Sequence, residues 1–357
     1  MPLARIAGLG HYVPERVTTN DDLAAVMETS DAWIRERTGI EERRYAAKTE
    51  ETTATMGAEA ARRACADAGV APGEIDFIVF ATLSPDYYFP GCGVLVQREL
   101  GIAEGECGAL DVRNQCSGFV YALSVAETFV AAGAYATVLV VGSEMHSMGL
   151  DFSTRGRAVT VIFGDGAGAA IVRPAADADA GGILASALHA DGTYAEKLAM
   201  LSPGSHGGKH LAAERRPDSW GFAPPEEYGG IFATRAMLDN GDFYPVMEGS
   251  FVFKLAVTKF PEVVREVLAK AGLTPADIDV LIPHQANLRI SQVVQKSLGL
   301  RDDQVFNNIQ RYGNTTAASI PIALSEAVDA GAVERGDLVV LAAFGSGFTW
   351  GAVALRY

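Results

Sequence analysis

Residues 66–80 read ADAGVAPGEIDFIVF and residues 269–283 read AKAGLTPADIDVLIP, with Ala, Gly, Pro, Ile and Asp at matching places. This similarity indicates an internal duplication. In each copy a glycine, Gly69 or Gly272, favours the end of a helix, a turn that contains proline follows, and Ile-Asp begins an apolar strand. We therefore predict that one helix–turn–strand unit occurs in each half of the chain.

The segments that follow also correspond between the halves. Residues 114–133 (NQCSGFVYALSVAETFVAAG) lead to the apolar run at 137–142, and residues 313–331 (GNTTAASIPIALSEAVDAG) lead to the apolar run at 338–345. A loop, a helix and a buried strand thus occur twice in the same order, which is typical of α/β proteins with parallel strands. We predict two α/β halves, each with a mainly parallel sheet, whose helix-start loops meet near the interface between the halves.

Turn-forming and charged residues at 172–182 predict the boundary between the halves. One half then spans residues 1–175 and the other spans residues 180–357. The second half contains a stretch rich in Gly and Pro, within an insertion at about 203–245. Long loops of this kind are usually functional, which favours a lid or an entrance to a site.

The composition is typical of a compact α/β enzyme, since 49% of the 357 residues are apolar and 20% are charged. The longest apolar runs are far shorter than the roughly 20 residues that a membrane span needs. A net charge of −15 argues against nucleic acid and against anionic membranes as partners. The N-terminal stretch MPLARIAGLGHYVPERV has no pattern of a secretion signal, so we expect a cytoplasmic protein.

An anionic partner would need a local basic patch, and two groups of cations are candidates. They are Arg35, Arg37, Arg43 and Arg44, and Arg289, Lys296, Arg301 and Arg311. Solvated surface charge is the alternative interpretation of both groups.

The cysteines and histidines do not predict a metal site. Cys65, Cys92, Cys107 and Cys116 form no CxxC pair and have no histidine at metal-binding spacing. The string HGGKH at 206–210 contains neither a carboxylate nor a cysteine. We therefore expect no metal and no disulfide, and we expect three of the cysteines to be small buried residues.

A thiol, an imidazole and a carboxamide stand at three strand-to-helix switches. Cys116 precedes small residues and an apolar helical run, and a helix N-terminus lowers the pKa of a thiol. His284 follows an apolar strand, and Asn314 precedes the second helix start. Taken singly, each residue has a structural explanation, namely packing for Cys116 and His284 and helix capping for Asn314. Taken together, the three predict an acyl-transfer site.

These motifs resemble the β-ketoacyl-acyl-carrier-protein synthases of type III, which are condensing enzymes of the thiolase superfamily. The resemblance runs nearly from end to end and includes WIRERTGI at 33–40, the Cys116 segment, DFSTRGR at 151–157, IFGDGAGAAIV at 162–172, PHQANLRI at 283–290, GNTTAAS at 313–319 and GSGFTWG at 345–351. It implies a thiolase-like fold of two duplicated halves in five layers, α-β-α-β-α. It also implies a homodimer.

The resemblance assigns roles to the three polar residues. Cys116 takes an acyl group from acyl-coenzyme A, and His284 and Asn314 support decarboxylation of malonyl-acyl carrier protein. The backbone N–H groups of Cys116 and Ser346 form the oxyanion hole. No metal or redox cofactor is implied.

The resemblance also predicts how the substrates bind. Trp33 would stack on the adenine of coenzyme A, and Arg37 and Arg155 would bind its phosphates. Asn287 and Phe344 would line the pantetheine channel. The residues expected to dock the acidic carrier protein are Lys254, Arg289 and Lys296.

Two departures from the family pattern concern the substrate. The last loop has Ser346 between Gly345 and Gly347, where the family carries three successive glycines. DYYFPGCG at 86–93 is bulky where a partner subunit would shape the acyl pocket, and we assign Phe89 to that pocket. With the insertion, this favours a primer longer than acetyl.

Two alternatives remain open at this point. One is a specialised relative that transfers its acyl group to an alcohol, an amine or a second β-ketoacyl chain in secondary metabolism. The other is a non-catalytic subunit that binds acyl chains for a partner synthase, which the intact set of Cys116, His284 and Asn314 argues against.

Overall fold

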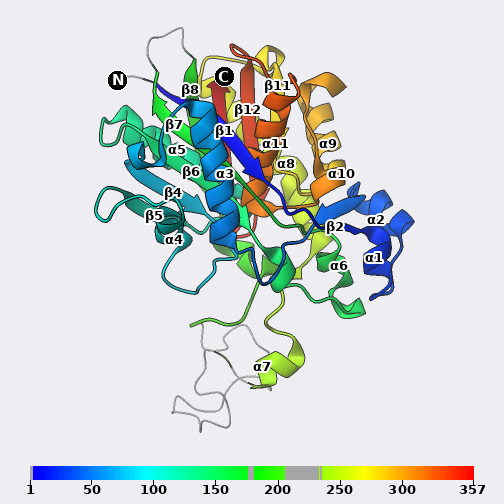
Figure 1. Ribbon diagram of the computed structural model, residues 1–357. Helices are drawn as coiled ribbons and strands as arrows, with labels where there is room; N and C mark the ends of the chain where they lie inside the picture. The colour runs from blue at the N-terminus through cyan, green and yellow to red at the C-terminus, as the bar shows by residue number, and fades with distance from the viewer. Residues whose placement is uncertain (1–2, 176–180, 206–232, 234) are drawn as a thin grey trace.

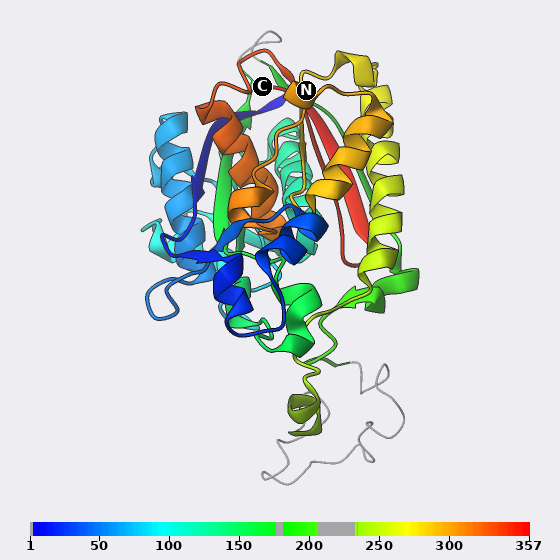
Figure 2. The ribbon, with the colours of Figure 1, turned by 90° about the vertical axis from the view of Figure 1, so that its right-hand side faces the viewer.

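The computed structural model describes residues 3–175, 181–205, 233 and 235–357. Two β-sheets lie face to face with helices between them and outside them (Figures 1 and 2). The string at 206–210 and most of the predicted insertion lie outside the described residues.

The duplicated unit has the predicted local structure in both halves. Helix α3 (Thr53–Ala68) ends at Gly69, where φ is 67°, and strand β4 (Phe77–Ala81) follows a 3₁₀ turn that begins at a proline. Helix α8 (Gly249–Lys270) is followed by Gly272 with φ of 72°, a second proline-led 3₁₀ turn and strand β11 (Val280–Pro283). Glycine suits these positions because it adopts a left-handed backbone without steric cost.

The two sheets have the same order over four strands, and the first sheet has a fifth strand, β5. The first sheet has the order β1-β7-β6-β4-β5, and the second has the order β8-β13-β12-β11. The remaining bounds are β1 (Ala4–Tyr12), β5 (Gly108–Val112), β6 (Val138–Glu144), β7 (Gly166–Pro174), β8 (Gly182–Ala190), β12 (Leu338–Gly345) and β13 (Thr349–Arg356).

Each sheet contains parallel strands as predicted, and the structure adds antiparallel strands beside them. Strand β4 pairs in parallel with β5 and β6, and β11 pairs in parallel with β12. Strands β7 and β1 join the first sheet antiparallel, as β13 and β8 join the second. β12 and β13 are separated by only three residues, and so short a connection reverses the chain and cannot make a parallel crossover.

The layers alternate as α-β-α-β-α. Helices α5 (Gly118–Ala131) and α11 (Ser319–Asp329) lie between the sheets, and their apolar faces join one core with strands of both sheets. Helices α3 and α4 (Cys92–Glu99) cover the outer face of the first sheet, and α8 and α9 (Leu288–Leu298) cover that of the second (Figure 2). The helix starts of α5 and α11 therefore meet inside the molecule.

Short elements complete the described chain. They are β2 (Val17–Thr19), α1 (Asn20–Ala24), α2 (Asp31–Thr38), β3 (Glu42–Arg44), α6 (Arg157–Thr160), β9 (Leu198–Ala199), α7 (Arg235–Asn240), β10 (Val246–Met247) and α10 (Ile309–Tyr312). None of the helices in the described ranges is long and apolar enough to cross a bilayer. All four cysteines are free. Of the three expected to be small buried residues, Cys65 and Cys92 are buried, whereas Cys107 is partly exposed; Cys116 is buried as well.

Candidate active site

The two helix starts are built alike. Each begins with a 3₁₀ turn, Gln115–Ser117 before α5 and Thr316–Ala318 before α11, and each turn opens on a non-glycine residue with positive φ. Cys116 and Ala317 thus occupy equivalent positions. The turns are in close contact, because a β carbon added to Gly118 would lie 3.3 Å from the β carbon of Ala317.

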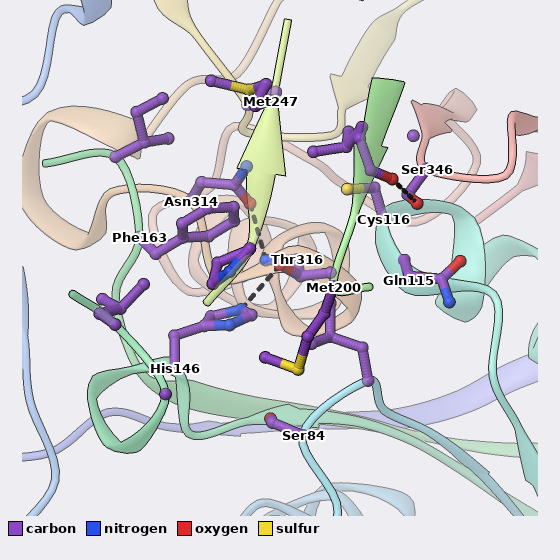
Figure 3. Close-up of a pocket in the computed structure, with 18 of the residues that line it drawn as sticks. Ser84, Gln115, Cys116, His146, Phe163, Met200, Met247, Asn314, Thr316 and Ser346 are labelled. Atoms are coloured by element: carbon purple, nitrogen blue, oxygen red, sulfur yellow. Dashed lines mark hydrogen bonds between the residues drawn. The ribbon is translucent and has the colours of Figure 1, made fainter. Parts of the chain in front are cut away.

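A cavity of about 1550 Å³ opens at this junction, and Cys116 and Asn314 line it (Figure 3). His284 lines the same cavity. Its walls come from both halves and are largely apolar. They include Leu83, Met145, Met148, Leu150, Val161, Phe163, Met200, Met247, Phe253 and Phe344. The structure therefore brings together the three residues that sequence analysis singled out.

Cys116 is buried against the end of β12. A β carbon on Gly345 would lie 2.7 Å from the Cys116 sulfur, so only glycine fits there. The backbone N–H groups of Ser346 and of Cys116 itself lie near this sulfur and act to lower its pKa. Both predicted oxyanion donors therefore lie beside the nucleophile.

The expected lowering of the thiol pKa is not what the structure shows. Burial, and second the negative charge of Glu144, raise the pKa of Cys116 to about 12, and the two N–H groups oppose this shift only in part. A short 3₁₀ turn in an apolar cavity supplies too little positive potential to offset the loss of water. The free protein therefore holds a neutral thiol.

His284 presents one free ring nitrogen to the cavity. Its backbone N–H donates to the Ala342 carbonyl (2.8 Å), and its Nδ1 lies 2.6 Å from Ser319 Oγ. Its buried Nε2 has no hydrogen-bond partner in the described part of the chain. Burial lowers the pKa of His284 to about 3, so the imidazole is neutral. With the Ser319 hydroxyl donating to Nδ1, Nε2 carries the proton and is a hydrogen-bond donor.

Asn314 is both a turn residue and a donor. Its Oδ1 accepts a hydrogen bond from the Thr316 backbone N–H (2.8 Å), which is the capping role expected for a structural asparagine. Its own N–H donates to the Ile162 carbonyl (2.8 Å) and anchors it to the first half. Because Oδ1 is engaged, the Nδ2 group is the part of the carboxamide available to a substrate.

Sequence analysis missed His146, which also lines the cavity. It opens the 3₁₀ turn His146–Met148 directly after β6, and its Nε2 lies 2.7 Å from Thr316 Oγ1. Burial, together with the nearby His284, lowers its pKa to about 3. Its place after a parallel strand, like that of His284 after β11, is the signal that could have identified it.

Trp33 lies at the rim of the cavity between two guanidinium groups. The guanidinium carbon of Arg37 is 4.5 Å from the indole centroid, and that of Arg157 is 4.9 Å from it. Arg155, the residue chosen from the sequence, pairs with Asp151 (2.6 Å), and Arg157 donates to the Glu28 carbonyl (2.6 Å). Neither arginine is among the described residues that line the cavity, so the role expected for Arg155 stays a prediction.

Asn287 and Phe344 line the same cavity. Asn287 caps α9 by accepting from the Arg289 N–H, and its Nδ2 donates to the Arg37 carbonyl (2.9 Å). This hydrogen bond joins the helix that carries Trp33 to the second half.

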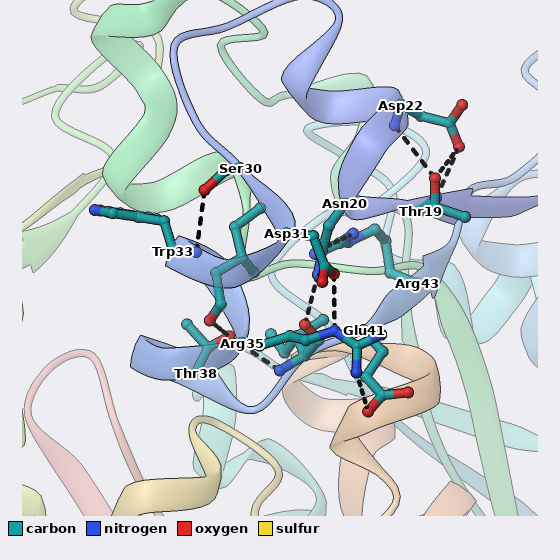
Figure 4. A network of polar contacts seen from close by, with 12 residues as sticks. Thr19, Asn20, Asp22, Ser30, Asp31, Trp33, Arg35, Thr38, Glu41 and Arg43 are labelled. Carbon is teal, nitrogen blue, oxygen red and sulfur yellow. Dashed lines mark hydrogen bonds and ion pairs between the residues drawn. The ribbon is translucent and has the colours of Figure 1, made fainter.

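The first predicted basic patch is not present. Arg43 is completely buried and donates to Asn20 Oδ1 and to two backbone carbonyls, while Arg35 pairs with Asp31 and Glu41 (Figure 4). Arg44 pairs with Glu42. These side chains brace the α1–α2 segment and leave little free positive charge.

The second group of cations divides in two. Arg301 and Arg311 pair with Asp303 and Glu326. Arg289 and Lys296, with Lys254 on α8, have no carboxylate partner within the ranges that the structure describes. Lys254 and Arg289 line the cavity mouth, and Lys296 lies further along α9.

The two departures from the family pattern have clear locations. Ser346 Oγ donates to the Leu198 carbonyl and joins the oxyanion loop to β9 (Figure 3). Phe89 is 81% exposed and does not line its own chain's cavity, whereas its neighbours Tyr87 and Tyr88 do.

Comparison with known proteins gives the same result as the motifs. Residues 110–192 match the family described as 3-oxoacyl-[acyl-carrier-protein (ACP)] synthase III, and residues 268–357 match its C-terminal part. The β-ketoacyl-[acyl-carrier-protein] synthase III of Xanthomonas campestris pv. campestris is 46% identical over 99% of this chain and 98% of that protein. The protein of the same name from Methylococcus capsulatus is 41% identical over 99% of both chains.

A solved structure agrees in fold as well as in sequence. The 3-oxoacyl-[acyl-carrier-protein] synthase III from Aquifex aeolicus VF5 has a TM-score of 0.83 at 42% identity and covers 99% of this chain and 100% of that chain. The alternative of a specialised transferase is not favoured by these relatives. The chain belongs to the β-ketoacyl-[acyl-carrier-protein] synthase III family of condensing acyltransferases.

Proposed function

We propose that this enzyme condenses an acyl-coenzyme A primer, longer than acetyl, with malonyl-acyl carrier protein and releases carbon dioxide. One observation carries the proposal. A buried thiol flanked by two N–H donors shares a cavity with a neutral imidazole whose Nε2 is unpartnered in the described chain and with a carboxamide whose Nδ2 is available.

In the first half-reaction the Cys116 sulfur attacks the thioester carbonyl of the primer. The oxygen of the tetrahedral intermediate becomes negative and accepts hydrogen bonds from the N–H groups of Cys116 and Ser346. The bond to the sulfur of coenzyme A then breaks, and coenzyme A leaves as a free thiol with the proton that Cys116 gave up. Because the thiol pKa is high, these donors must offset the cost of developing negative charge.

In the second half-reaction the bond between the malonyl methylene carbon and its carboxylate breaks, and carbon dioxide leaves. The electron pair becomes an enolate on the thioester carbonyl. His284 Nε2–H and Asn314 Nδ2–H would donate to its oxygen as two neutral groups, which stabilise the enolate without holding it as an ion pair. The enolate carbon then attacks the acyl-cysteine, the carbon–sulfur bond breaks, and the Cys116 thiolate that leaves takes up one proton from solvent to become the thiol again. These steps balance without a metal or redox cofactor.

The cavity rim suits a nucleotide with a phosphorylated tail. Trp33 would offer its indole face to a purine. Arg37 and Arg157, which now contact the indole, would bind the phosphates instead. Lys254 and Arg289 at the mouth, with Lys296 further along α9, would attract an acidic carrier protein to it.

The cavity volume supports a primer longer than acetyl. The cavity of about 1550 Å³ includes the rim at Trp33 and Arg37 and so would take the coenzyme as well as the acyl chain, but it exceeds the about 300–1,000 Å³ of ordinary ligand pockets. Four methionines line it, namely Met145, Met148, Met200 and Met247. Methionine is flexible and adapts to apolar ligands of different shape.

We further propose a homodimer that pairs at the β5 edge of the first sheet. Strand β5 has a neighbour on one side only, and Leu110 on it is exposed. An unprotected edge strand of this kind is suited to pairing with a second copy. Phe89 would then enter the acyl cavity of the partner. Sedimentation analysis tests the dimer, and Phe89→Ala in the dimer should extend the range of accepted primers.

The decisive experiment is the intact-protein mass after incubation with acyl-coenzyme A thioesters from acetyl to dodecanoyl. We expect a mass gain that is largest for medium chains, absent in Cys116→Ala and unchanged in Cys107→Ala, which removes the partly exposed thiol instead. Addition of malonyl-acyl carrier protein should then release carbon dioxide. A clear preference for acetyl would refute the longer primer. Full activity of Cys116→Ala would indicate a non-catalytic subunit, and acyl transfer without carbon dioxide release would indicate a specialised transferase.

A further inference from the structure

His146 has no part in the reaction as described above, yet its imidazole lines the active-site cavity. It is 6% exposed, and its ring packs on Phe163 with the centroids 4.7 Å apart. The one hydrogen bond of the imidazole among the described residues joins Nε2 to Thr316 Oγ1 (2.7 Å). Burying a polar ring is costly unless it is hydrogen-bonded, so Thr316 is the partner that makes this position tenable.

Thr316 has an unfavourable backbone conformation. Its φ is 49°, a left-handed conformation that is unusual for a β-branched residue and strains the backbone. Such a conformation persists only when the surrounding contacts hold it. The bond from His146 holds the side chain of Thr316, and the 3₁₀ turn holds its backbone.

The backbone of Thr316 in turn orients the catalytic carboxamide. Its N–H donates to Asn314 Oδ1 (2.8 Å), so the direction of this N–H decides which end of the carboxamide faces the substrate (Figure 3). If Thr316 relaxed toward ordinary φ values, its N–H would turn away from Oδ1. Asn314 would then be free to rotate, and Nδ2 would lose its fixed direction.

We propose that His146 is a positioning residue that acts through Thr316 to orient the Asn314 carboxamide for decarboxylation. This inference rests on the proposed function, because it assigns Asn314 to the enolate oxygen. It concerns the second half-reaction alone, since Cys116 and its two N–H donors belong to the other helix start and to β12.

The charge state of His146 is consistent with this role. Burial keeps its imidazole neutral. A neutral ring can hold Thr316 by a hydrogen bond without placing a cation beside His284. A positive charge there would compete with His284 and Asn314 for the enolate oxygen.

The test separates the two half-reactions in matched variants. His146→Leu removes the hydrogen bond and keeps an apolar side chain, while Thr316→Val removes the same bond from the other side and keeps the β-branched shape. Thr316→Ser, which retains the hydroxyl, is the control. Acylation of Cys116 is followed by intact mass, and carbon dioxide release from malonyl-acyl carrier protein is followed on the pre-acylated enzyme.

Each of the two variants should lower the rate of carbon dioxide release about tenfold, as expected for the loss of one buried hydrogen bond. Acylation should stay within about twofold, and Thr316→Ser should retain the wild-type rate of release. The double variant should be no slower than the slower single one, because both changes break one contact.

Equal loss of both half-reactions, additive effects in the double variant, or unchanged carbon dioxide release in folded Thr316→Val would overturn the proposal. Thermal unfolding of each variant shows whether it folds, and Thr316→Val serves if His146→Leu does not. Failure of the wild-type enzyme to be acylated or to release carbon dioxide would instead refute the proposed function, and this inference with it.

Discussion

The Cys116 sulfur lies so close to the backbone of Gly345 that an added β carbon would stand 2.7 Å from it. This contact holds the nucleophile beside the Ser346 N–H, because Gly345 and Ser346 are consecutive at the end of β12. The oxyanion hole therefore requires a residue without a side chain at position 345.

The change Gly345→Ala should abolish this fit. The added methyl group must displace either the thiol or the Ser346 N–H, and loss of one oxyanion donor typically lowers the rate about 100-fold or more. We expect acylation of Cys116, followed by intact mass, to fall by that factor. Gly73→Ala is the control, because a β carbon there has no neighbour within 4 Å. Acylation at the wild-type rate in Gly345→Ala would show that the loop tolerates a side chain.

The change Ser319→Ala should weaken decarboxylation through His284. Without the hydroxyl, Nδ1 loses its partner (2.6 Å), and the proton is no longer directed to Nε2. We expect carbon dioxide release to fall about tenfold, the value of one buried hydrogen bond, while acylation changes little. The two rates measured on one preparation check this, and a larger effect on acylation would contradict the assigned tautomer.

The two buried imidazoles should make the fold sensitive to acid. Burial lowers the folded-state pKa of His146 and His284 to about 3, below the ordinary value of 6.5. Below pH 6.5 the unfolded chain binds protons that the folded chain does not, so the free energy of unfolding decreases as the pH falls. At pH 5 each imidazole lowers the free energy of unfolding by about 2 kcal/mol.

Comparison of wild type with His146→Leu isolates one of these groups. Glu144 acts in the opposite direction, because burial raises its pKa to about 7 and the folded state then holds the proton, but it is present in both proteins. We measure the free energy of unfolding with urea at pH 7.5 and at pH 5. Between these pH values we expect it to fall by about 2 kcal/mol more in the wild type than in His146→Leu. A difference independent of pH would show that His146 is protonated in the folded state.

The cations at the cavity mouth should affect the binding of malonyl-acyl carrier protein and not the acylation of Cys116 by the primer. Arg289→Glu should raise the KM for malonyl-acyl carrier protein about tenfold and make it less sensitive to salt, since like charges then face each other. Acylation by coenzyme A thioesters should change less than about twofold. Arg301→Glu is the control, because Arg301 is already paired with Asp303. Equal effects of the two variants would exclude a docking role for Arg289.

Much of the fold follows from local sequence. Gly69 and Gly272 end helices where the pattern predicts it, because each adopts a left-handed φ that other residues avoid. The apolar runs form the buried central strands because only a sheet covered on both faces accommodates them. The antiparallel pairing of β1 with β7 and of β8 with β13 joins segments that are distant in the chain, so no local sequence pattern predicts it.

The sequence by itself determined the duplication and the positions of Cys116, His284 and Asn314 in loops that precede helices. Cys116 and His284 follow strands as predicted, whereas Asn314 follows the short helix α10. Tertiary structure alone decided their electrostatics, since burial raises the pKa of Cys116 where the helix start predicted a lower value. It also decided which cations are free, because Arg43 is buried by contacts with residues as distant as Val161. His146 belongs with these features. Only folding places it beside Thr316, 170 residues away along the chain, since such contacts depend on the packing of the whole molecule.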